Sequence, residues 1–325
     1  MHIVTLTRLS VAAAALLLLA VGNGRAAGLT YIGQQIVPSG TLFAGTTVGG
    51  LSGIDRIGTS SQYLAISDDR SNLQPARFYG LSLDLTQFVR SAAPGNAGVN
   101  FQTVTPLLRP DGSTFAANQV DPESIRINPA TGTLYWSNEG QRAAAGFQNP
   151  TVREMSATGV YVRDFSVPDR YAPAGTVAGT TPGDRGIYNN LAFESLTIST
   201  DGRTVYTATE NALAQDGSVA GVGAGSNARI LSFDVASGQA GAEYVYPVSP
   251  VALPPAVPGA FATNGLVELL AVGDRQFVAV ERSFATGAAT PGVGPNGLPT
   301  GNSIRLYFVD ARDASDVSGV AGLSG

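Results

Sequence analysis

Carboxylates that could do chemistry recur at a fixed interval along this chain. The segment ESIRINPATGTLYWSNE runs from Glu123 to Glu139, and ESLTISTDGRTVYTATE runs from Glu194 to Glu210, starting 71 residues later. The two segments align without a gap, and each begins and ends with Glu. We expect Glu123 to face Glu139 across a hairpin, and Glu194 to face Glu210. Because facing carboxylates repel each other, the repetition predicts a positive partner at that end of the hairpins.

The same interval continues in both directions. One further acid lies 71 residues before Glu139, and another lies 71 residues after Glu210. Each member of the series is predicted to close a short apolar strand. The series is Asp68, Glu139, Glu210 and Glu281.

Two kinds of cation could balance these acids. Arg70, Arg142 and Arg282 follow closing acids and are candidate substrate clamps. The other candidate is a hard cation, with Ca²⁺ expected first, because carboxylate, carbonyl and amide oxygens are its usual ligands. The predicted metal ligands are Asp68, Asp69, Glu123, Glu139, Asn190 and Glu281. The predicted catalytic residues are Glu194, Glu210, Arg70, Arg142 and Arg282. The alternative is that the acids form salt bridges that lock neighbouring structural units together.

The composition excludes most nucleophilic chemistry. The chain has no Cys and no Lys, and its single His is His2. Catalytic triads that need His, Cys nucleophiles, Lys Schiff bases and zinc fingers are therefore excluded. Any reaction must use carboxylates, Arg, hydroxyl groups, backbone groups or a bound cation.

The N-terminus predicts export. Arg8 precedes a short apolar run, Val11 to Val21, and small residues follow it. We expect residues 1–27 to be a signal peptide and the protein to be secreted or periplasmic. The remaining chain carries 17 Arg against 24 acids, which argues against nucleic acid as a partner. No other apolar run is long enough to span a membrane.

The elements that must position the acids are predicted to be short antiparallel strands. They are rich in Val, Ile, Tyr and Thr and are separated by turn residues such as DG and TG. An Arg series with 76-residue spacing marks a following strand in each repeat: Arg77, Arg153, Arg229 and Arg305. Repeats of several strands predict an all-β propeller of five or six blades. The alternative is a β-sandwich with coincidental spacing.

The order of these motifs resembles the phytase-like domain family of secreted bacterial proteins. The resemblance rests on LSGIDRI, YLAISDDR, DPESIRINPATGTLYWSNEG and NNLAFESLTISTDGRTVYTATEN, followed by ARILSFDV and FVAVERS. It implies a propeller that hydrolyses a phosphate or other ester. The family-typical acids it implies are Asp68, Asp69, Glu123, Glu139, Glu194, Glu210 and Glu281, with Asn190 ahead of the third hairpin. Family members usually end with one more acid-bearing repeat, which would fall past Gly325. The domain, residues 28–325, is therefore expected to be C-terminally incomplete.

Two functions remain open at this point. The first is a Ca²⁺-assisted hydrolase of a small-molecule ester or phosphoester. The second is a non-catalytic propeller that binds a ligand or protein and holds Ca²⁺ structurally. A serine esterase is not expected, because the chain has no G-x-S-x-G elbow and no His base outside residue 2. Related alkaline phytases also grip phosphate with Lys, so the lack of Lys argues against phytate as the substrate.

Overall fold

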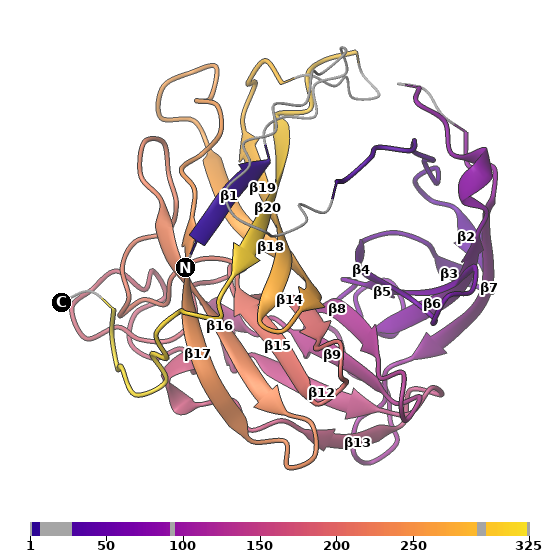
Figure 1. The fold of residues 1–325 in the computed structure, drawn as a ribbon, viewed down its shortest axis with the longest axis horizontal. Coiled ribbons are helices and arrows are strands. Elements are labelled where there is room, and N and C mark those ends of the chain that lie inside the picture. The colour runs from indigo at the N-terminus through magenta and orange to yellow at the C-terminus, as the bar shows by residue number, and fades with distance from the viewer. Residues whose placement is uncertain (1, 7–27, 92–94, 291–296, 324–325) are drawn as a thin grey trace.

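The computed structural model describes residues 2–6, 28–91, 95–290 and 297–323. Four antiparallel four-stranded sheets, numbered 1 to 4 along the chain, form a ring (Figure 1). Sheet 1 contains β4 (Leu51–Arg56), β5 (Gln62–Ser67), β6 (Arg77–Leu83) and β7 (Val99–Pro106). Sheet 2 contains β8 (Pro122–Ile127), β9 (Leu134–Asn138), β12 (Thr151–Met155) and β13 (Tyr161–Asp164). Sheet 3 contains β14 (Phe193–Ile198), β15 (Thr204–Thr209), β16 (Ser226–Asp234) and β17 (Ala240–Val248).

Sheet 4 combines strands from both ends of the chain. It contains β18 (Ala262–Gly273), β19 (Gln276–Ala285), β20 (Asn302–Asp310) and β1 (His2–Leu6). Two short hairpins, β2–β3 (Leu42–Phe43, Thr46–Thr47) and β10–β11 (Gln141–Ala143, Gly146–Gln148), lie outside the sheets. Two single-turn 3₁₀ helices are η1 (Leu85–Gln87) and η2 (Asp169–Tyr171). Apart from β1, the predicted signal peptide lies outside the described residues.

The predicted propeller class is confirmed, but the predicted number of blades is wrong for the part of the chain described. Four repeats are visible in the sequence and four sheets are present, whereas five or six were expected. Each sheet needs only about 50 residues, and long loops account for the rest of the 71-residue interval. The second Arg series also lies where it was expected, on the third strand of each sheet: β6, β12, β16 and β20.

The first strand of each sheet lies nearest the centre of the ring (Figure 1). There β8 packs against β4 and β14, and β14 packs against β18. Apolar side chains fill the three junctions between consecutive sheets, and each junction contains buried aromatic rings. Between sheets 3 and 4, for example, the rings of Tyr206 and Phe277 meet edge to face with centroids 5.0 Å apart. These cores hold the inner strands in fixed positions around the axis.

A β-bulge interrupts each inner hairpin, at aligned positions in sheets 1 to 3 and two residues further along in sheet 4. The register shifts lie between Leu51 and Gly53, Pro122 and Ile125, Phe193 and Ser195, and Leu266 and Glu268. A bulge adds a residue to one strand and re-aims its side chain. Here the extra residues include Ser52, Glu123, Glu194 and Val267.

The bulges make the predicted facing pairs wrong. The backbone N–H of Glu139 donates to the carbonyl of Asp121, and that of Glu210 donates to the carbonyl of Ala192. Glu123 and Glu194 therefore do not stand opposite the closing acids, because the bulge shifts the pairing beside them. Glu281 also differs from the prediction. It lies inside β19 and faces Leu266, so it does not end a strand.

Candidate acidic site on the propeller axis

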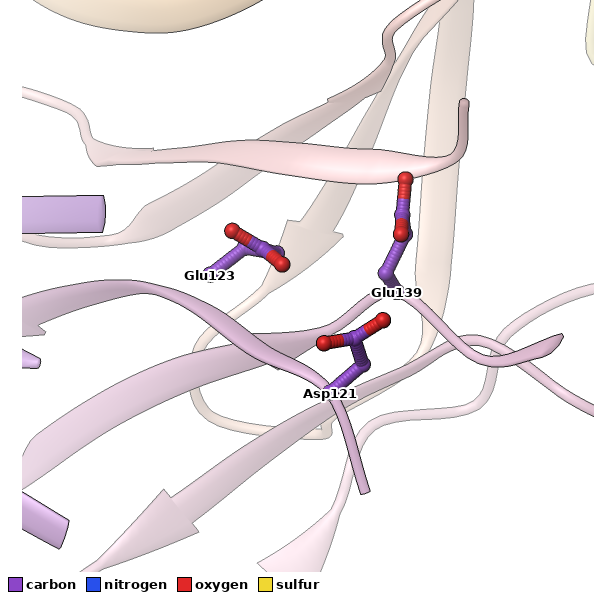
Figure 2. A group of neighbouring side chains, drawn as sticks. All are labelled: Asp121, Glu123 and Glu139. Atoms are coloured by element: carbon purple, nitrogen blue, oxygen red, sulfur yellow. The ribbon is translucent and has the colours of Figure 1, made fainter. Parts of the chain in front are cut away.

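Five buried carboxylates gather where the inner hairpins of sheets 2 and 3 end. Asp121, Glu123 and Glu139 form one group, and Glu139, Glu194 and Glu210 form a second. Within each group, one oxygen from every carboxylate lies within 4.8 Å of the others. Figure 2 shows the first group, with the three carboxylates around one space between β8 and the chain that leaves β9. Glu139 belongs to both groups and therefore joins them.

The local backbone explains why these side chains meet. The bulges aim Glu123 and Glu194 away from the regular alternation of their strands. Glu139 and Glu210 directly follow β9 and β15, and their side chains turn in from the strand ends. Gly265 on β18 leaves the space that Glu210 occupies, because a Cβ built there would lie 2.1 Å from Glu210 Oε1.

Burial raises the pKa values of Glu123, Glu139 and Glu210, so these carboxyl groups hold their protons to higher pH. Burial and the neighbouring carboxylates Glu194 and Asp121 raise the pKa of Glu139 well above its ordinary value. Burial and the charge of Glu194 raise the pKa of Glu210 to about 8. Burial, with Glu194 and Glu139 nearby, also raises the pKa of Glu123 well above its ordinary value. A buried carboxyl group in this state either stays protonated or needs a cation.

One carboxylate oxygen of Glu139 has no hydrogen-bond donor among the described residues. Its Oε1 accepts a hydrogen bond from the backbone N–H of Ala192 at 2.8 Å. Its Oε2 is buried and has no donor opposite it. The residue is 1% exposed, so bulk solvent does not reach this oxygen. A hard cation fits this environment, since the donors are all oxygen atoms and they converge from several directions.

A polar pocket of about 310 Å³ opens beside the acids. Every side chain that lines it is polar: Ser52, Asp68, Asp69, Arg70, Asn72, Asp121, Glu123, Asn190, Glu194 and Arg282. The lining comes from all four sheets and their loops. Asp68 lies at the exposed rim of the pocket. Partial burial of its carboxyl group and the charge of Asp69 raise its pKa, although the charge of Arg282 opposes this. The predicted ligands Asp68 and Asn190 therefore lie at the pocket, beside the buried acids.

Two guanidinium groups face this pocket. Arg70 donates to Gln141 Oε1 at 2.9 Å, and its Nε lies 3.4 Å from Asp121 Oδ2. Arg282 lies 3.9 Å from Glu194 Oε1 and its side chain is 52% exposed. Arg282 is therefore free to meet a ligand in solution, whereas Arg70 is already engaged by Asp121 and Gln141.

The structure places Arg142 and Glu281 away from the pocket. Arg142 is fully buried and donates to four carbonyls of the following loop: Ala174, Thr176, Arg185 and Ile187. Its donors are therefore occupied by backbone, and a role as a substrate clamp has no support from its position. Glu281 accepts hydrogen bonds from Tyr246 and Ser249, which link it to sheet 3, and from Asn264 within sheet 4.

Asp69 lines the pocket but its oxygens are used within its own loop. They accept from Arg77 at 2.7 Å and from the backbone N–H groups of Asn72, Leu73 and Gln74. Burial alone would raise the pKa of Asp69, but these bonds, led by that of Arg77, lower it overall. Asp69 therefore shapes the loop that carries Asn72 to the pocket.

Sequence reasoning missed Asp121. This residue opens the DPES motif, but the aligned position in the third repeat is Ala192. A search for acids shared between repeats therefore passes over it. The motif itself was a usable signal, since Asp121 lies only two residues before Glu123.

The fold and the site define a four-sheet β-propeller with an acidic pocket on its axis. A family model described as phytase-like, esterase-like activity of phytase, matches residues 46–325. The chain therefore belongs to the phytase-like family. None of the curated proteins matches the chain.

Solved structures with some likeness are distant. They include the Dos1 propeller, at 9% identity and a TM-score of 0.31 over 76% of this chain. A tail fibre of Staphylococcus aureus phage P68 matches at 9% identity and a TM-score of 0.33 over 79% of this chain. KlHsv2 with loop 6CD replaced by a Gly-Ser linker matches at 9% identity and a TM-score of 0.30, covering 82% of this chain and 87% of that one. The chain spans 64% of the first structure and 49% of the second. These likenesses are too remote to inform function.

Within the described ranges, no helix has the length and apolar character of a membrane span.

Proposed function

We propose that this protein binds a hard divalent cation, with Ca²⁺ as the first candidate, in the axial acidic site and hydrolyses a phosphate or other ester in the adjoining pocket. One observation carries the proposal. Glu139 joins two carboxylate groups and keeps one buried oxygen without a donor. A polar network left incomplete in this way destabilises a folded protein unless a ligand completes it.

The residues would divide the work as follows. Asp121, Glu123, Glu139 and Glu210 would hold the cation through their oxygens, and Glu194 would stay free of it. The cation would supply Lewis acidity, which polarises an ester and lowers the pKa of a nearby water. Arg282 would bind the anionic oxygens of the substrate, because it is the exposed guanidinium at the pocket.

The remaining chemistry is constrained by composition. With neither Cys nor Lys in the chain and its one His at residue 2, the nucleophile is best supplied by water. Glu194 lies at the pocket and has a pKa raised by burial, although Arg282 opposes the shift. A carboxylate with a raised pKa can accept a proton from water near neutral pH, so Glu194 is the proposed general base.

The test measures binding and turnover separately on the full chain. Ca²⁺ binding is measured by calorimetry, and hydrolysis is measured with p-nitrophenyl phosphate and p-nitrophenyl acetate, with Ca²⁺ or with EDTA. We expect Ca²⁺ to bind and turnover of at least one ester to require it. Glu194→Gln should abolish turnover and leave the thermal melting profile cooperative. Turnover that persists undiminished in this variant would count against the proposed base.

A second candidate is a propeller that holds Ca²⁺ for stability and binds a ligand without reaction. The observation that favours it is the deep burial of the carboxylates. Glu123, Glu139, Glu194 and Glu210 are each at most 7% exposed, which leaves a bound cation little contact with substrate. Ca²⁺ binding with a large rise in melting temperature, and no turnover of either ester class, would select this candidate.

A further inference from the structure

A second cleft lies on sheet 2, and none of the five axial carboxylates lines it. Its volume is about 520 Å³. It lies between the loop that precedes β8, the β10–β11 hairpin and the start of β12. The lining residues are Arg109, Phe115, Gln119, Asn138, Phe147, Gln148, Asn149, Thr151 and Arg153.

The charge of this cleft is opposite to that of the axial pocket. Two Arg line it, and among the described residues no carboxylate does. The side chain of Arg109 is 42% exposed, and Asp111, the acid paired with it, is 3.9 Å away and more exposed still. Exposed ion pairs at this distance contribute little, so Arg109 remains available to an anion.

Arg153 provides a positively charged group whose position in the cleft is fixed. Its guanidinium carbon lies 5.3 Å from the ring centroids of both Phe115 and Trp136. Its Nε lies 3.1 Å from Asp164 Oδ1, and the Arg153 side chain keeps 17% of its surface exposed. Stacking on two rings restricts the side chain, so little conformational entropy is lost when an anion binds.

The cleft also presents an aromatic ring that is held in place from behind. Phe147, on β11, is 38% exposed. The guanidinium carbon of Arg142 lies 5.4 Å from the centroid of its ring. Arg142 is itself fixed by four backbone carbonyls, so the ring has a rigid support. An exposed, immobilised phenyl ring suits the flat face of another ring.

Four amides complete the polar lining. Gln148 donates to the carbonyl of Asn118 at 2.7 Å, and Asn138 Oδ1 accepts from the backbone N–H of Asp121 at 2.7 Å. These bonds orient the amide groups. The hydroxyl of Thr151 has no hydrogen-bond partner in the part of the chain that the structure describes. Amides and hydroxyls around one ring face are suited to a ligand that carries several hydroxyl groups.

We propose that the cleft on sheet 2 binds an acidic sugar, that is, a sugar ring bearing a carboxylate or a phosphate. Arg109 and Arg153 bind the anionic group, Phe147 packs against the ring, and the amides bind its hydroxyls. The proposal does not depend on the cation or the reaction proposed for the axial site, although Asn138 lines the cleft and also binds the backbone of Asp121.

The experiment is calorimetric titration of the full chain in EDTA, which keeps divalent cations from the axial site. The ligands are glucuronate, glucose 6-phosphate, neutral glucose and inorganic phosphate. We expect one or both acidic sugars to bind at millimolar concentration or better, with glucose and phosphate at least about tenfold weaker. The preference between glucuronate and glucose 6-phosphate identifies whether the anion is a carboxylate or a phosphate.

Variants assign the binding to the cleft. Arg109→Gln and Phe147→Ala should each weaken binding by about tenfold or more. Arg203→Gln, on the exposed β14–β15 turn, is the matched control and should bind as the unaltered chain does. Thermal melts confirm that each variant is folded. The proposal is overturned if neither acidic sugar binds, if glucose binds as tightly, or if Arg109→Gln leaves binding unchanged.

Discussion

At the residue scale, Glu139 is the side chain on which the axial site depends most. It is buried, it contributes to both carboxylate groups, and one of its oxygens has no donor. Replacing this single side chain therefore tests the whole axial site at once.

Glu139→Gln should have opposite effects with and without Ca²⁺. Without the cation, the amide needs no proton to stay neutral in this buried position, so the free energy of unfolding at pH 8 should rise by about 1 kcal/mol. With the cation, affinity should fall by about tenfold or more, because a ligand oxygen shared by both groups loses its charge. Thermal melts in EDTA and calorimetric Ca²⁺ titrations measure the two effects. Unchanged Ca²⁺ affinity would contradict the assignment.

Arg282 and Arg142 should behave differently although both follow an acid of the repeat series. Arg282→Gln should reduce turnover and leave the melting temperature nearly unchanged, since its side chain is half exposed. Arg142→Gln should destabilise the protein by about 3 kcal/mol, because several buried carbonyls lose their donors. Kinetics and denaturant unfolding separate the two, and Arg203→Gln is the control. Equal loss of stability in both variants would refute the distinction.

At the element scale, the bulges decide which side chains reach the axis. In a regular hairpin, the 71-residue interval alone would have set every facing pair. Instead, each inner strand carries at least one extra residue, and an extra residue is an acid only in sheets 2 and 3. The acidic site is therefore confined to these two sheets, although the repeats extend over four.

Gly265→Ala tests the packing between sheets 3 and 4 at the site. A methyl group there would lie 2.1 Å from Glu210 Oε1 and 2.2 Å from Glu210 Cγ, so the Glu210 side chain must move. We expect a loss of about 2 kcal/mol in the free energy of unfolding and weaker Ca²⁺ binding. Gly49→Ala is the control, because a Cβ there meets nothing within 4 Å. A variant with normal stability and Ca²⁺ affinity would show that Glu210 is not held where it lies.

Much of the site could be predicted from the spacing, because the repeats preserve both the acids and the strands that carry them. Glu123, Glu139, Glu194 and Glu210 do come together. What could not be predicted depends on local geometry. A bulge has no required residue type, so the register stayed hidden, and Asp121 has no acidic counterpart in the third repeat. Arg142 shows the converse error, since a position that follows an acid does not reveal which loop will bury the side chain.

At the scale of the whole molecule, the acids make stability depend on pH. The pKa of Glu210 is raised from an ordinary value near 4.5 to about 8. Between these values the folded protein holds a proton that the unfolded chain releases, so the free energy of unfolding falls as pH rises through this window. Each pKa unit corresponds to about 1.4 kcal/mol. Carboxyls with lowered pKa, such as Asp69, titrate below the window.

Without divalent cations, the melting temperature should therefore be lower at pH 8 than at pH 5. Added Ca²⁺ should raise it more at pH 8, because the cation replaces the protons that the site loses. Thermal melts at both pH values, in EDTA and in Ca²⁺, measure the difference. A melting temperature in EDTA that is equal or higher at pH 8 would contradict the raised pKa values.

One guanidinium connects three of the sheets at the end of the inner strands that lies away from the carboxylates. Arg126, on β8, lies 2.6 Å from Glu268 on β18 and donates to the carbonyl of Ile54 on β4. It therefore ties sheet 2 to sheet 1 and, across the centre, to sheet 4. Arg126 holds the inner strands together at this end, whereas the carboxylates of the axial site repel one another, when ionised, at the other end. On heating or under force, the inner strands should therefore separate first at the carboxylate end and last at Arg126.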